Sequence, residues 1–129
     1  TYPNVHWLGA MPPADFRSHL EACRVGIIAY DLSGNNNNEL RSPLKAISYM
    51  ASGKCVISNI DCETPSLNGK AVYFANNKMA FESLIERAFR GNLVFDKKSV
   101  DEFLKNGNYD SLLEIIFRSL NAKLPEKII

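Results

Sequence analysis

The residues best suited to chemistry lie between positions 41 and 58, around a serine, a proline and a lysine. Ser42 is a good helix N-cap, and Pro43 at the first helical position gives up no hydrogen bond, because that N–H would be unpaired anyway. The free amides of Leu44 and Lys45, together with the helix dipole, favour a negatively charged ligand. The Lys45 ammonium adds a full positive charge. These residues predict an anion-binding helix start, although an ordinary capped helix with a solvated lysine fits them too.

This helix belongs to an alternation of strands and helices. Gly53 can take the left-handed conformation that ends a helix, and a β-rich run follows it. Apolar residues at helical spacing predict further helices around Phe16 and Leu84. The expected strands are Val5–Leu8, Val25–Tyr30, Cys55–Ser58 and Ala71–Ala75. The alternation predicts an α/β fold with a Rossmann-like open, mostly parallel sheet of about four strands, flanked by helices. The order of the strands is expected to reverse next to Val25–Tyr30.

The C-terminal part is expected to be helical. Val100, Phe103 and Leu104 indicate a short helix, and the apolar pattern from Leu112 to Leu120 indicates a stronger one. A chain of 129 residues with 46% apolar content is long enough for one compact unit. We therefore interpret residues 1–129 as a single α/β domain, a piece of a longer protein, with C-terminal helices at about 97–122.

The expected sheet also predicts where a ligand binds, because open parallel sheets bind ligands beyond the carboxyl ends of their strands. Three polar loops fall at that edge, namely Gly9–Pro12, Asp31–Ser42 and Asn59–Asn68. The Asp31–Arg41 loop holds four consecutive asparagines and little apolar surface. It is expected to be the least ordered internal segment when no ligand is bound.

Composition excludes several classes of function. A net charge of +1 without a long basic run gives no reason to expect nucleic-acid binding. No stretch approaches the roughly 18 apolar residues of a membrane span. The three cysteines match no zinc framework, and Cys23 and Cys55 are expected to be buried thiols of a cytoplasmic protein. His6 and His19 are expected to be structural or surface residues.

Several segments together resemble a known family. Pro43–Lys45, a helix, and then Met50–Ile57 are similar to the donor-site signature of GT-B glycosyltransferases of the "group 1" type. Asn4–Gly9 and Val25–Tyr30 match the preceding part of that family's C-terminal domain. The resemblance runs in order from residue 4 to residue 89.

In that family the C-terminal domain holds a nucleotide diphosphate sugar as donor substrate, with no cofactor. The donor-binding positions that the resemblance implies are Gly9, Ala10 and Met11 at the nucleobase, Ser42, Leu44 and Lys45 at the diphosphate, and Ser48 at the ribose. Ser48 replaces the usual glutamate and should bind a diol more weakly. No catalytic residue is identified. Some members carry an acidic residue near the donor sugar at the position that Leu40 occupies here. Glu39 is the next residue to it, and its carboxylate either contacts the sugar or is solvated in the loop.

Asp61 and Glu63 superficially resemble the acidic pair of the other major glycosyltransferase fold, which holds a metal ion and a diphosphate. Two carboxylates at this spacing are common in polar loops, and the GT-B resemblance implies a mechanism without metal. We therefore expect no metal site.

The resemblance implies the donor-binding half of a cytoplasmic glycosyltransferase of polysaccharide biosynthesis. The acceptor would be a glycan or lipid-linked hydroxyl, brought by an N-terminal domain, and the full-length protein could associate peripherally with a membrane. The 129 residues alone are expected to be inactive, because the acceptor-side residues belong to that domain. Two alternatives stay open. A receiver-like signalling module could use Asp31 as phosphoacceptor, but Gly9–Met11 offers no acidic pair. A GT-B sugar-nucleotide epimerase would share the nucleotide site.

Overall fold

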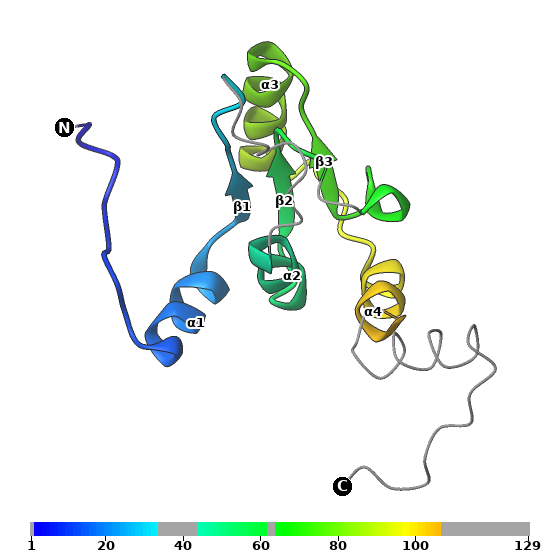
Figure 1. The fold of residues 1–129 in the computed structure, drawn as a ribbon, viewed down its shortest axis with the longest axis horizontal. Helices are drawn as coiled ribbons and strands as arrows, with labels where there is room; N and C mark the ends of the chain where they lie inside the picture. The colour runs from blue at the N-terminus through cyan, green and yellow to red at the C-terminus, as the bar shows by residue number, and fades with distance from the viewer. Residues whose placement is uncertain (1, 34–43, 62–63, 107–129) are drawn as a thin grey trace, which may run out of the picture.

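The computed structural model describes residues 2–33, 44–61 and 64–106. Its elements alternate along the chain, as the colours of Figure 1 show. In chain order they are α1 (Pro13–Ala22), β1 (Val25–Ile28), α2 (Leu44–Ala51), β2 (Cys55–Ser58), the 3-10 turn η2 (Pro65–Leu67), β3 (Val72–Phe74), α3 (Lys78–Phe89) and α4 (Lys97–Asn106).

The three strands form one parallel sheet in the order β1-β2-β3. Val25 pairs with Cys55 at the start of β1, and Val56 pairs with Val72 at the start of the β2–β3 ladder. All four residues of β2 are buried, as expected of a central parallel strand covered on both faces. The predicted α/β class, with an open parallel sheet flanked by helices, is confirmed.

Residues 5–9 are not a strand, contrary to the sequence prediction for Val5–Leu8. Figure 1 shows the N-terminal segment leading into α1, apart from β1. The alternating pattern gives a segment only the propensity to extend, whereas a strand also needs a neighbour for its N–H and C=O groups. Within the described residues no strand lies on the outer side of β1, so the order is consecutive and the predicted reversal next to Val25–Tyr30 is absent there.

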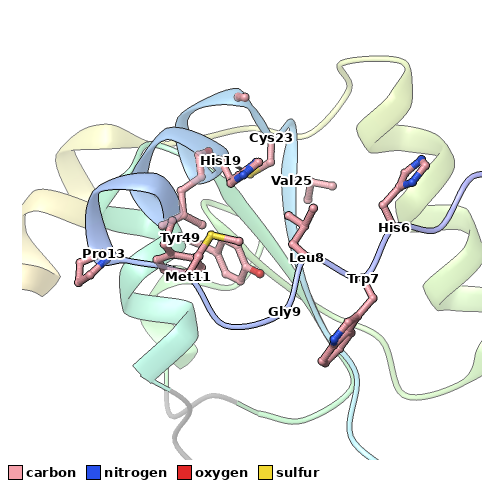
Figure 2. Close-up of a pocket in the computed structure, with 13 residues that line it drawn as sticks. His6, Trp7, Leu8, Gly9, Met11, Pro13, His19, Cys23, Val25 and Tyr49 are labelled. Carbon is pink, nitrogen blue, oxygen red and sulfur yellow. Dashed lines mark hydrogen bonds between the residues drawn. The ribbon is translucent and has the colours of Figure 1, made fainter.

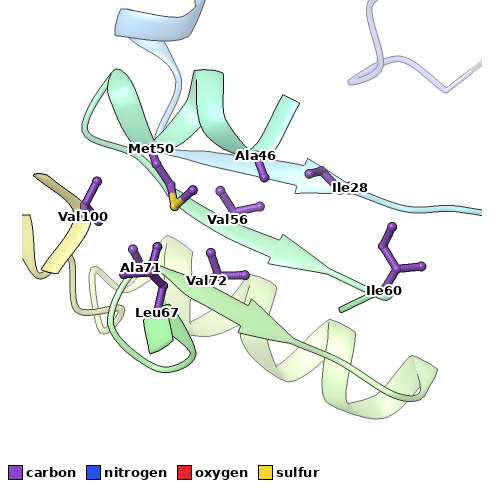
Figure 3. Close-up of a cluster of buried hydrophobic side chains, with 9 residues drawn as sticks. All are labelled: Ile28, Ala46, Met50, Val56, Ile60, Leu67, Ala71, Val72 and Val100. Atoms are coloured by element: carbon purple, nitrogen blue, oxygen red, sulfur yellow. The ribbon is translucent and has the colours of Figure 1, made fainter. Parts of the chain in front are cut away.

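Two apolar clusters hold the layers together, one on each face of the sheet. The first joins Ile28, Val56 and Val72 to α2 and to Val100 of α4 (Figure 3). The second joins alternate strand residues, including Ile57, to α3. This alternation follows from the period of two along a strand. It places α2 and α4 over one face and α3 over the other.

A glycine allows α2 to lie close to β1. The ring of Tyr49 packs directly on Gly26, where a Cβ atom would come within 2.6 Å of Tyr49 Cδ1 and closer still to Cγ and Cδ2. Any other residue at this position would push the helix or the ring away. The spacing between α2 and β1 therefore depends on the absence of a side chain at residue 26.

Helix ends follow the expected local chemistry. Gly53 has φ of 73° just after α2, as predicted for the residue that ends this helix. The Asn77 side chain caps α3 by accepting the Ala80 N–H at 2.9 Å. Asp96 caps α4 by accepting the N–H of Ser99 at 3.2 Å and its hydroxyl at 2.8 Å.

Some predictions concern residues outside the described ranges. These are the helix cap at Ser42 and Pro43, most of the Asp31–Arg41 loop, and the helical pattern from Leu112 to Leu120. The prediction of buried thiols is confirmed for Cys55, which is 8% exposed, whereas Cys23 is only half-buried.

Candidate functional site

The start of α2 lies at the carboxyl edge of the sheet. Ala46, in its first turn, packs with Ile28 at the end of β1, whereas Met50 packs further back over Val56 (Figure 3). The chain then turns at Gly53 and enters β2 at its amino end. Because α2 runs against the strands, its N-terminus points to the edge where open parallel sheets bind ligands.

Lys45 is the strongest charge in the first turn of α2. It is exposed, and the first turn contains no acidic residue. No hydrogen bond or ion pair joins its ammonium to another described residue. The helix dipole disfavours a cation at this end. A free lysine in this position therefore gains stability from an anion that both the lysine and the helix start can bind.

Ser48 stands one turn further along α2, where the resemblance implies a ribose contact. Its hydroxyl donates to the Leu44 carbonyl oxygen at 3.3 Å. Serine hydroxyls commonly bond backward in this way inside helices. In this arrangement the hydroxyl can still accept a hydrogen bond from a ligand, but its proton is already used.

Gly9 and Met11 line a separate hollow of about 890 Å³ between the N-terminal segment and α1 (Figure 2). Gly9 has φ of 71°, a conformation that favours glycine. The hollow also includes both histidines and Tyr49 of α2. Ala10 is exposed and does not line it, and neither do Leu44, Lys45 and Ser48. The structure thus divides the predicted donor-binding residues into two groups.

A second hollow, of about 410 Å³, opens at the carboxyl edge on the α3 side. Asn59 lies at this place and pairs with Tyr30 in both directions. Its Oδ1 accepts the Tyr30 N–H at 2.9 Å, and its Nδ2 donates to the Tyr30 oxygen at 2.7 Å. Asn77 and Phe81 line the α3 side. The sequence placed the loop that begins at Asn59 at this edge but did not predict the hollow, and it did not single out Asn77, although an asparagine before a helical pattern is a usual N-cap.

The carboxylates of this edge differ in how far the structure describes them. Asp31 accepts hydrogen bonds from the Ser33 hydroxyl at 2.6 Å and the Ser33 N–H at 2.8 Å, and these bonds lower the pKa of its carboxyl group. Asp61 is exposed. Glu39 and Glu63 lie outside the described residues, so nothing is added on their predicted roles. Among residues 2–33, 44–61 and 64–106, no three His, Cys, Asp or Glu side chains gather into a metal-binding group.

The fold and the edge site define a Rossmann-like α/β unit with a cationic helix start at the carboxyl ends of its strands. No family model, curated protein or solved structure matches the chain. No helix in the described part of the chain is long and apolar enough to cross a membrane.

Proposed function

We propose that the chain is the nucleotide-diphosphate-sugar binding half of a glycosyltransferase, which transfers a glycosyl group to a hydroxyl of a glycan or lipid-linked acceptor. One observation carries the proposal. The exposed Lys45 has no partner among the described residues, and it lies in the acid-free first turn of α2, at the carboxyl edge of a parallel sheet. The ordered sequence resemblance from residue 4 to residue 89 supports the sugar-nucleotide class over other anions.

The same groups suit the chemical step. When the bond between the anomeric carbon and the diphosphate breaks, negative charge develops on the departing diphosphate. Fixed N–H groups and a cation aimed at that charge lower the barrier, because they need no rearrangement as it forms. The Leu44 and Lys45 amides and the Lys45 ammonium would supply these donors. The acceptor hydroxyl and the group that removes its proton would come from elsewhere in the full-length protein.

Calorimetry with UDP, GDP and ADP tests the proposal. Hydrogen bonds to charged groups contribute about 1.5–3 kcal/mol, so Lys45→Ala should weaken diphosphate binding about tenfold or more. The matched control is Lys98→Ala. Lys98 is also an exposed second residue of a helix, but it lies on α4. Its loss should leave the affinity unchanged.

Two results would count against the proposal. Absence of binding to all three diphosphates would remove the nucleotide site. An equal loss of diphosphate affinity in Lys45→Ala and Lys98→Ala would show that the lysines act only through the overall charge of the protein. Product analysis of the full-length enzyme then separates transfer from the epimerase alternative, since only transfer needs an acceptor.

A further inference from the structure

The ring of Tyr49 determines how closely α2 can lie against β1. The inner atoms of this ring occupy the place where a side chain at residue 26 would begin, since a Cβ atom at Gly26 would come within 2.6 Å of Tyr49 Cδ1. Tyr49 is half-buried and packs against the first apolar cluster. Close-packed atoms have no room to approach further, so this contact sets the separation of the helix and the strand.

The start of α2 lies one helical turn from this contact. Residues four apart, such as Lys45 and Tyr49, lie one above the other on the same face of a helix, about 6 Å apart along its axis. Because α2 runs against the strands, this step corresponds to about two residues forward along β1, from Gly26 to Ile28. The packing of Ala46 with Ile28 agrees with this register (Figure 3). A shift of α2 at Gly26 therefore also moves the helix start over the carboxyl end of β1.

The backbone amides at the helix start depend on this spacing more than the lysine side chain does. The Lys45 ammonium is carried by a flexible four-carbon chain, which can follow a ligand through a shift of about 1 Å. The N–H groups of Leu44 and Lys45 are fixed to the helix, and their hydrogen bonds require heavy-atom distances of about 2.7–3.2 Å. A displaced α2 would thus lose amide contacts with an anion even while the ammonium keeps its own.

We propose that Gly26 and Tyr49 are positioning residues of the diphosphate site, which hold the start of α2 where its amides reach the anion. The ring of Tyr49 supplies the contact, and the absence of a side chain at Gly26 supplies the room for it. Both residues act through the helix rather than through the ligand. This inference rests on the proposed nucleotide site, because Leu44 and Lys45 define the place of the anion there.

Calorimetric titration of Gly26→Ala with UDP, GDP and ADP tests the inference. The added methyl group should displace the start of α2, and the loss of one charge-assisted hydrogen bond weakens diphosphate binding about tenfold. The matched control is Ala88→Gly, which makes the reverse change in α3, at a buried residue of the second apolar cluster. It also lowers stability, because glycine disfavours a helix, but the diphosphate affinity of the folded protein should stay at the wild-type value.

Two further measurements separate positioning from loss of stability. Nuclear Overhauser effects between the methyl groups of Ala46 and Ile28 report where the first turn of α2 lies, and they should weaken in Gly26→Ala but not in Ala88→Gly. Tyr49→Phe keeps the ring and should retain the wild-type diphosphate affinity, whereas Tyr49→Ala removes the contact and should lower it.

The possible failures are distinguishable. Unchanged diphosphate affinity in Gly26→Ala, or an equal loss in Ala88→Gly, overturns the positioning role and leaves the nucleotide site in place. Absence of binding by the wild type removes the nucleotide site itself, and the positioning role with it. If Gly26→Ala does not fold, the two variants of Tyr49 decide the question, since equal affinity of Tyr49→Phe and Tyr49→Ala overturns the inference.

Discussion

The contact between Gly26 and Tyr49 allows a quantitative prediction. In Gly26→Ala the new Cβ would lie within 2.6 Å of Tyr49 Cδ1, well inside ordinary van der Waals distance. The ring cannot swing aside cheaply, because the overlap involves its inner atoms Cγ and Cδ2 rather than the far end of a flexible chain. The helix or the ring must therefore retreat by roughly 1 Å, and overpacking of this kind costs about 1–3 kcal/mol. For a chain of 129 residues each kcal/mol lowers the Tm by roughly 3–4 °C.

Urea unfolding followed by circular dichroism measures this cost. A double-mutant cycle with Tyr49→Ala separates the overlap from other effects, because removal of the ring opens space for the new methyl group. Gly26→Ala should be much less costly in the Tyr49→Ala background than in the wild type, with a coupling of at least about 1 kcal/mol. Full stability of Gly26→Ala, or the same loss in both backgrounds, would refute the argument from close packing.

Two further predictions concern the helix caps. Asn77→Ala should destabilise the protein by about 0.5–2 kcal/mol through loss of the bond to the Ala80 N–H, whereas Asn77→Ser should retain most of the stability in urea unfolding; equal loss in both variants would contradict the capping role. The Ser99 hydroxyl, and then the Ser99 N–H, lower the pKa of the Asp96 carboxyl in the folded state, so its ionised form stabilises the fold. This contribution is present above the unfolded pKa of about 3.9 and is lost as the pH falls through the lower folded value. The stability difference between wild type and Asp96→Ala should therefore narrow in unfolding curves measured below about pH 4, and a constant difference would contradict it.

The sequence predicted the parts of the fold that depend on local chemistry. Cys55–Ser58 forms the strand that its β-rich run indicated, and Gly53 closes α2 in the left-handed conformation. The error at Val5–Leu8 has a different origin. Strand formation there depends on a neighbouring strand, and no local pattern reports whether one is present.

The candidate site was predictable only in part. The position of Lys45 at the carboxyl edge followed from the expected alternation of strands and helices, and the structure has it there. The hydrogen bond from the Ser48 hydroxyl to the Leu44 carbonyl oxygen was not predicted, because a serine hydroxyl in a helix can find a hydrogen-bond partner in several rotamers. The hollow lined by Asn59 and Phe81 was also missed, since its residues meet only through the sheet and α3.

The pairing of Asn59 with Tyr30 extends the sheet beyond its last backbone pair. The amide of Asn59 reproduces the donor and acceptor of a backbone residue, so the β1–β2 ladder effectively continues past the last paired residues. The Tyr30 N–H should therefore exchange with solvent about as slowly as the N–H groups inside the β1–β2 ladder, because its acceptor is a side chain at the end of β2. The sheet thus stays paired at its carboxyl edge for two residues beyond the end of β1.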